Sequence, residues 1–205
     1  VIGVTGITGN NIARELLAND WTVYGLSRKP GQDIDGVHHI YGDVMNTADL
    51  QEKVADLGIT HLFYCTWSRQ ATEAENCLVN KAMLANTLDA VNAKTPLEHA
   101  LLITGLKHYL GPFDNYANAV MAETPFHEDE PRLDVPNFYY TQEDELFEAA
   151  KKQGFTWSVH RSHTIFGYAV DNAMNMVLTL SCYAEIQKAL GKPFIYPGSW
   201  QSWNG

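Results

Sequence analysis

Cysteines and long apolar runs are scarce in this sequence of 205 residues. Cys65, Cys77 and Cys182 lie far apart and match no C-x-x-C spacing, which argues against a disulfide framework and the common zinc and redox motifs. Reduced thiols of this kind are typical of cytosolic proteins. No apolar run approaches the roughly 20 residues that span a bilayer, and no signal-peptide pattern is visible. We therefore expect a soluble, cytoplasmic protein without a membrane partner.

Basic side chains are also in short supply. The chain has 14 Lys and Arg against 24 Asp and Glu, a formal net charge of −10 with histidine neutral. Nucleic acids and anionic membranes favour clustered basic residues, so this balance argues against either as the main partner. It does not exclude a small anionic cofactor that a few basic side chains hold locally.

Apolar residues make up 45% of the chain, which is ordinary for a globular domain. Strand-like runs alternate with helical stretches, the pattern of βαβ units that wind a parallel sheet. The predicted fold class is α/β, a Rossmann-type doubly wound parallel sheet with helices on both faces. We predict strands at 1–4, 22–26, 37–41, 61–64, 100–104, 156–160 and 192–196, and helices at 10–18, 49–57, 75–91, 139–153 and 174–190.

The two ends of the chain predict a piece of a longer protein. Residues 1–4 read as the second half of a buried strand, without a leading methionine. Residues 192–196 read as a short strand that is followed by a turn-rich segment and no closing helix.

A glycine pattern joins the first strand to the first helix. Gly3, Gly6 and Gly9 form G-x-x-G-x-x-G. Glycines at such a turn let the backbone approach a pyrophosphate at the positive helix N-terminus. Glycines at a strand–helix turn also serve packing alone, so the pattern by itself leaves both interpretations open.

The end of the second strand favours NADPH over NADH. In a dinucleotide fold this point lies beside the adenosine ribose, where an acid selects NAD and a basic residue accommodates a 2′-phosphate. Ser27, Arg28 and Lys29 stand there, without a carboxylate. A solvated basic turn is the alternative. Asp43 and Val44, after the third strand, suit a turn that lines the adenine, with an ordinary surface aspartate as the alternative.

The usual catalytic motif of short-chain dehydrogenases is missing. A tyrosine beside a lysine can donate a proton or stabilise an oxyanion near a substrate carbonyl. No Y-x-x-x-K occurs in this chain, because Tyr139 is followed four residues later by Glu143, and Tyr140 by Asp144. This spacing therefore supplies no lysine beside either tyrosine.

Four segments carry a specific resemblance. They are HLFYCTW at 61–67, TGLKHYLGPF at 104–113, NFYYTQED at 137–144 and WSVHRSHTIFG at 157–167. Together they resemble the progesterone 5β-reductase and iridoid synthase-like family of atypical extended short-chain dehydrogenases, from Gly3 to about Gly205. The resemblance implies NADPH-dependent reduction of the C=C bond of a small enone or enal. One departure is Ser162, where the family usually has proline, a residue that would stiffen the loop.

The resemblance also implies roles for individual residues. Lys107 and Tyr139 become the catalytic pair that stabilises an enolate, and Trp67 and Phe113 become walls of the substrate pocket. No metal site is expected. The implied cofactor contacts, beside the glycine turn and Ser27, are Thr5, Gly6, Ile7, Arg28, Lys29, Asp43, Val44, Thr66, Ile103, Ile165, Asn172, Ala173 and Met174.

The resemblance further predicts the domain organisation. Residues 1–170 are expected to form the NADP(H)-binding Rossmann domain with the catalytic pair, and residues 171–205 the start of a substrate-binding lobe. Two other functions remain open, a nucleotide-sugar epimerase or dehydratase and a non-catalytic NADP(H)-sensing protein. The protein could act as a monomer or as a homodimer, and the sequence leaves both open. His108 is expected to be structural and His163 to line a pocket.

Overall fold

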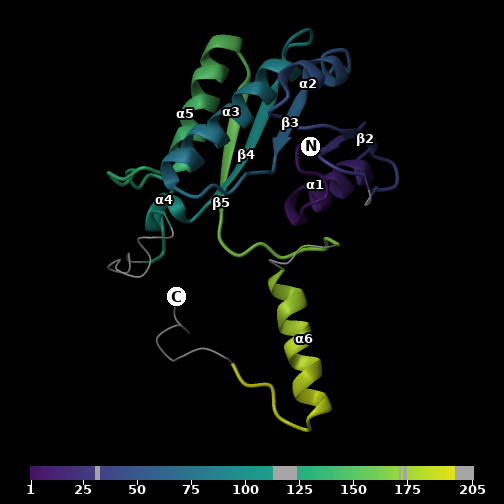
Figure 1. Cartoon of the computed structure of the whole chain (residues 1–205), viewed down its shortest axis with the longest axis vertical. Coiled ribbons are helices and arrows are strands. Elements are labelled where there is room, and N and C mark those ends of the chain that lie inside the picture. The colour runs from purple at the N-terminus through teal and green to yellow at the C-terminus, as the bar shows by residue number, and fades with distance from the viewer. Residues whose placement is uncertain (31–32, 113–123, 171, 173–174, 197–205) are drawn as a thin grey trace.

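The computed structural model describes residues 1–30, 33–112, 124–170, 172 and 175–196 of the chain. It is a parallel sheet with helices on both faces (Figure 1), which confirms the predicted fold class. In chain order the elements are α1 (Ile7–Ala18), β1 (Tyr24–Ser27), β2 (His38–Tyr41), α2 (Thr47–Val54), β3 (His61–Tyr64), α3 (Glu73–Val91), β4 (His99–Gly105), α4 (Lys107–Leu110), α5 (Phe138–Gln153), β5 (Thr156–Ser162) and α6 (Met176–Ala189).

The strand order reverses in the middle of the sheet. β1 pairs with β2, and β3, β4 and β5 follow one another, all in parallel. Ile2 joins the two halves through parallel bridges to Leu26 and Tyr64. Counting Ile2 as the first strand position, the order is that of a Rossmann sheet, and its switch point lies beside the glycine turn.

Two apolar clusters hold the helices to the sheet. The larger contains side chains of α2, α3 and α5, among them Leu50, Leu84 and Leu146, packed with strand residues. The smaller joins α1 to the first residues of the chain, with Ala13 against Val4. Burial of these apolar faces is the main favourable contribution to folding.

The two helices that flank the site start at defined caps. Thr72 caps α3 through a reciprocal capping box with Glu75. The Asn137 side chain caps α5, which ends at Gly154 with φ of 85° in the left-handed region. These caps fix where the first residues of α3 and α5 lie.

Several predicted boundaries were wrong. Residues 1–4 form no strand, because only Ile2 pairs there, through isolated bridges to Leu26 and Tyr64. Residues 192–196 form no strand, because no neighbouring strand pairs with them in the described part of the chain. α1 begins at Ile7, directly after the glycine turn, and the short helix α4 was not predicted.

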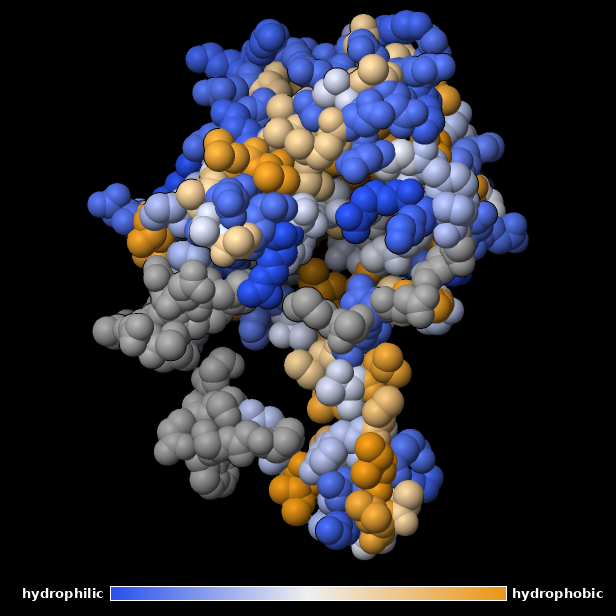
Figure 2. All heavy atoms as spheres, viewed as in Figure 1, coloured by the Kyte–Doolittle hydropathy of each residue, from blue (hydrophilic) through white to orange (hydrophobic). Residues whose placement is uncertain are grey.

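The last helix extends away from the sheet (Figure 1). α6 buries none of its described residues, and its apolar side chains form an orange stripe along the helix in Figure 2. Asn175 attaches its start by donating a hydrogen bond to the Gly167 carbonyl at 3.1 Å. Among the described helices, none is long and apolar enough to cross a lipid bilayer.

Candidate functional site

Two adjoining cavities open at the carboxyl ends of the strands. The larger, of about 820 Å³, lies near the ends of β4 and β5 and reaches the start of α6. The smaller, of about 280 Å³, lies near the ends of β1 and β2. Both are lined by Gly6, Cys65, Thr66 and Trp67. The combined site is elongated and crosses the switch point of the sheet, where this fold binds its ligands.

The glycine turn forms the floor between the two cavities. Gly3 has φ of 79°, and a Cβ there would lie 2.9 Å from the Cys65 carbonyl oxygen. A Cβ on Gly9 would overlap the Gly3 carbonyl, so Gly9 serves the packing of helix on turn and lines neither cavity. Gly3, Thr5 and Gly6 line the smaller cavity, and Ile7 the larger.

The start of α1 suits an anion. Gly6 is its N-cap residue, and the first turn contains no acidic side chain. Within the described residues no side chain makes a capping hydrogen bond to this helix start. The backbone N–H groups of the first turn and the helix dipole therefore favour a negative group here. Gly3, Thr5 and Gly6 also line the smaller cavity, so these residues fit the pyrophosphate of a dinucleotide.

The basic end of β1 lines the smaller cavity only in part. Ser27 and Arg28 line it, together with Asp43 and Val44 from the turn after β2. Lys29 is exposed and lines neither cavity, although its carbonyl accepts a hydrogen bond from the Ser27 hydroxyl at 3.1 Å. Arg28 is thus the basic side chain that the geometry places at this end of the site.

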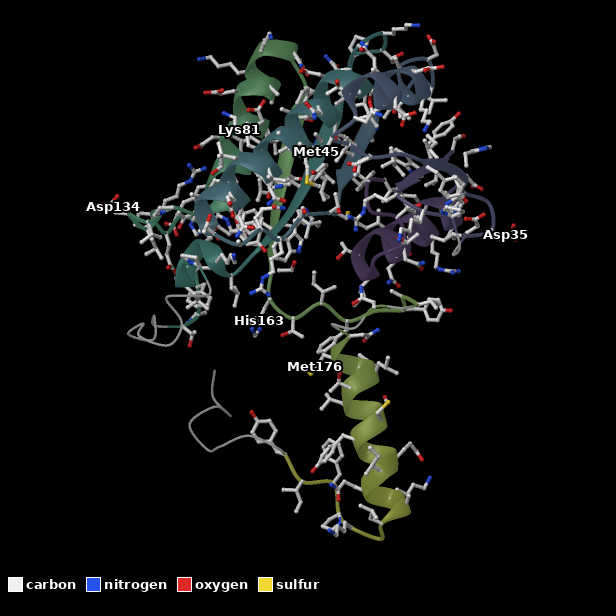
Figure 3. All side chains as sticks on the ribbon, in the orientation of Figure 1. Asp35, Met45, Lys81, Asp134, His163 and Met176 are labelled. Carbon is white, nitrogen blue, oxygen red and sulfur yellow. The ribbon has the colours of Figure 1, made fainter. Side chains whose placement is uncertain are left out.

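The larger cavity gathers residues that lie far apart in the sequence. Thr66, Ile103, Ile165 and Asn172 all line it. His163 also lines it, as expected, and is labelled in Figure 3 between the sheet and α6. The expected positions Phe113, Ala173 and Met174 lie outside the described residues. Residues that sequence reasoning did not select also line it: Thr8, Thr104, Asn175, Met176 and Thr179.

Tyr139 reaches the larger cavity from the first turn of α5. Its backbone N–H donates to Asn137 Oδ1 at 3.0 Å, which fixes the start of the helix. Its hydroxyl lies against Gly105, since a Cβ on that glycine would be 3.4 Å from the hydroxyl oxygen and 2.9 Å from the Ser162 carbonyl oxygen. Gly105 therefore allows Tyr139 and β5 to approach the end of β4 closely.

Lys107 lies behind the cavity wall rather than in it. Its side chain is only 4% exposed, and its Nζ lies 3.5 Å from Glu73 Oε2. The same Nζ is 4.6 Å from the Phe138 ring centroid and 6.0 Å from that of Tyr139. Trp67, whose ring stacks on Phe138, is 5.9 Å from the ammonium. The ammonium and the tyrosine, though distant in sequence, are thus neighbours.

The position where Y-x-x-x-K would place a lysine is filled by a buried carboxylate. Glu143 is 1% exposed, and its Oε2 lies 2.9 Å from an Arg132 guanidinium nitrogen. Its Oε1 lies 3.5 Å from Arg161 Nε. Both contacts tie α5 to its neighbours, so Glu143 has a structural role and Lys107 supplies the cation from another element.

Cys65 lines both cavities as a neutral group. Burial raises the pKa of its thiol to about 12, so the thiol keeps its proton throughout the neutral range. No group of three or more His, Cys, Asp or Glu in the described ranges is arranged to hold a metal ion.

Sequence reasoning missed Glu73. It is the first residue of α3, and its two carboxylate oxygens contact Lys107 and the start of α5. The sequence offers no signal for these contacts, because acidic residues are common in the first turn of a helix and Glu73 cannot be told from an ordinary one.

The sheet order, the glycine turn and the cleft at the switch point define a Rossmann domain of the dinucleotide-binding class. Residues 31–205 match the model of the PRISE-like Rossmann-fold domain. The chain belongs to that family.

Curated relatives match the chain over its whole length. The chain is 45% identical to the 3-oxo-Delta(4,5)-steroid 5-beta-reductase of Arabidopsis thaliana, over 100% of its own length and 55% of the relative's. It is 44% identical to the (S)-8-oxocitronellyl enol synthase of Nepeta cataria, with the same coverage. The chain therefore spans about half the length of these relatives.

Solved structures share the fold at low sequence identity. The UDP-glucose 4-epimerase of Thermus thermophilus in complex with NAD has a TM-score of 0.70 at 16% identity, over 94% of this chain and 63% of that one. A short-chain dehydrogenase/reductase superfamily protein of Agrobacterium tumefaciens with bound NAD has a TM-score of 0.65 at 17% identity, over 93% and 58%.

Proposed function

We propose that this chain is the cofactor-binding and catalytic part of an NADPH-dependent reductase, which reduces the C=C bond of a small α,β-unsaturated carbonyl compound. The observation that carries the proposal is the pairing of Tyr139, on the larger cavity, with the buried Lys107 ammonium. The names of the two curated relatives, a steroid 5-beta-reductase and an oxocitronellyl enol synthase, support the same chemistry.

NADPH is the proposed cofactor. The glycine turn and the start of α1 would hold its pyrophosphate, and Arg28 its 2′-phosphate at the end of the smaller cavity. Thr66, Ile103, Ile165 and Asn172 would line the nicotinamide half of the site. Domain 1–170 would carry these contacts, and 171–205 would begin the substrate lobe.

Tyr139 and Lys107 would act on the charge that develops on the substrate. When bound, the reduced nicotinamide supplies a hydride to the β-carbon of the enone. Negative charge then builds on the carbonyl oxygen, and the Tyr139 hydroxyl donates a hydrogen bond to it and stabilises the enolate. The Lys107 ammonium stabilises the same charge electrostatically from behind the aromatic wall. Trp67 would form one side of the substrate pocket.

The test follows NADPH absorbance with the full-length protein and small enones such as cyclohexenone. Tyr139→Phe removes only the hydroxyl and is expected to lower kcat by about 10²–10³-fold, the cost of losing one donor to an oxyanion. Lys107→Met is expected to lower kcat as well, and neither change should weaken NADPH binding much. Absence of turnover with every enone, or unchanged kcat in both variants, would overturn the proposal.

A further inference from the structure

Glu73 connects three elements around the candidate catalytic pair. It begins α3, and its Oε1 accepts a hydrogen bond from the Phe138 backbone N–H at 2.8 Å, at the start of α5. Its Oε2 lies 3.5 Å from Lys107 Nζ on α4. Asn76, one turn along α3, donates to the same Oε2 at 2.9 Å and holds the carboxylate in place.

A buried ammonium requires a counter-charge. The Lys107 side chain is 4% exposed and that of Glu73 14%, so neither charge is well solvated. Removing a cation from water is costly unless an anion or hydrogen bonds compensate it. The titratable groups that face the ammonium include Glu73 from α3 and Tyr139 from α5, while Phe138 and Trp67 present uncharged rings.

The same carboxylate lies at the start of the helix that carries the tyrosine. Phe138 is the first residue of α5 and directly precedes Tyr139. An anion at a helix N-terminus is favoured by the unpaired N–H groups and the helix dipole there. One side chain therefore fixes both the lysine and the helix turn that presents the tyrosine.

We propose that Glu73 is a positioning residue for the reaction: it keeps Lys107 protonated and holds its ammonium beside Tyr139. The inference rests on the proposed function. A simpler alternative is that Glu73 only caps α5 and contributes to stability. The two roles differ in one respect. A positioning role requires the negative charge of Glu73 to keep Lys107 protonated, whereas a capping role requires only a hydrogen-bond acceptor.

Glu73→Gln separates these alternatives. Glutamine keeps an oxygen that can accept from the Phe138 N–H, but it removes the charge beside Lys107. Burial then favours the neutral amine, so the lysine releases its proton at a lower pH than in the wild type. In the full-length protein with NADPH and cyclohexenone, kcat of the variant is expected to approach the wild-type value at acidic pH. Above the new transition kcat should fall, at most about tenfold per pH unit, until it reaches the value of Lys107→Met.

The matched control is Glu75→Gln, in the same helix turn. Glu75 accepts a hydrogen bond from the Thr72 N–H at 3.0 Å, and glutamine can keep that bond. The control removes the same charge from α3 and should leave the pH profile unchanged. Glu73→Asp keeps the charge and should retain a wild-type alkaline limb at reduced kcat, which supplies a second variant if Glu73→Gln folds poorly.

A cofactor-free measurement tests the pairing directly. Thermal unfolding of Glu73→Gln, Lys107→Met and the double variant forms a double-mutant cycle. The free energy of unfolding should fall less in the double variant than the sum of the falls in the two single variants. Additive losses, or an equal fall in kcat at every pH, would overturn the inference. If the proposed function is wrong, the wild type will not turn over any enone. The unfolding cycle still measures the coupling between Glu73 and Lys107 in that case.

Discussion

Arg28 is the residue on which the proposed preference for NADPH over NADH depends. It lines the smaller cavity at the end of β1, whereas Lys29 lines neither cavity. A charge-assisted hydrogen bond contributes about 1.5–3 kcal/mol, or roughly tenfold to a hundredfold in affinity. Arg28→Ala is therefore expected to weaken NADPH binding by at least about tenfold and NADH binding little, as measured by fluorescence titration.

Lys29→Ala is the control for this prediction. It removes an adjacent positive charge of the same turn, yet it should change the NADPH dissociation constant less than Arg28→Ala does. Equal losses of NADPH and NADH affinity in Arg28→Ala would contradict the 2′-phosphate role.

Gly105 is a second residue at which a substitution is expected to lower kcat. A Cβ there would lie 2.9 Å from the Ser162 carbonyl oxygen and 3.4 Å from the Tyr139 hydroxyl. Gly105→Ala should therefore separate the ends of β4 and β5 and displace the tyrosine. Misplacement by about 1 Å can lower a rate about 10²-fold, so a loss of that order in kcat is expected in the NADPH assay.

Gly154→Ala provides the comparison for Gly105→Ala. Gly154 ends α5 with φ of 85°, and an added Cβ meets nothing within 4 Å. Alanine there should cost stability through backbone strain while kcat stays near the wild-type value. If Gly105→Ala lost stability and kept kcat in the same way, the close approach at Tyr139 would be irrelevant to activity.

For single residues, the sequence indicated which side chains belong to the candidate site but not which side chains they contact. Lys107 and Tyr139 were found through a family resemblance, because no local spacing connects them. The contact between Glu73 and Lys107 depends on how α3 and α4 pack, which no sequence pattern records. Gly9 was predicted as part of a phosphate turn, and the structure gives it a packing role.

The start of α5 is the element on which the site depends most. The Asn137 side chain accepts from the Tyr139 N–H through Oδ1 and donates through Nδ2 to the Lys107 carbonyl at 2.6 Å. Asn137→Ala removes both contacts. It is expected to lower the free energy of unfolding by about 1–2 kcal/mol, as for other N-caps, and to lower kcat as well because both members of the pair lose a support.

Asn46→Ala is a matched change at another helix. Asn46 caps α2 by accepting from the Asp49 N–H. It lines neither cavity, and its neighbour Met45 lines only the smaller one, not the cavity that Tyr139 reaches. Chemical denaturation should show a comparable loss of stability, with kcat unchanged. A similar kcat in both variants would show that the α5 cap acts on stability alone.

Whole elements were easier to predict than their ends. β3 was predicted at its observed bounds, because an apolar run between polar turns in a βαβ pattern leaves little choice. The strand predicted at 192–196 was wrong, since a strand requires a neighbour to complete its hydrogen bonds and alternation of side chains cannot supply one.

The whole molecule should gain stability from its cofactor. A ligand that binds only the folded state adds about 2.7 kcal/mol at a free concentration 100 times its dissociation constant. Thermal unfolding of the full-length protein is thus expected to shift upward with NADPH, and less with NADH at the same concentration. The absence of any shift with either nucleotide would count against the Rossmann cleft as the cofactor site.

The buried Glu143 limits which substitutions this chain can accept at position 143. It lies between Arg132 and Arg161, at the position where a Y-x-x-x-K motif that began at Tyr139 would place its lysine. Glu143→Lys alone would place a third cation between two arginines in a buried site, which is strongly unfavourable. A lysine at this position would therefore need several coordinated substitutions. In this chain the proposed catalytic lysine on α4 therefore cannot be moved to position 143 by one substitution.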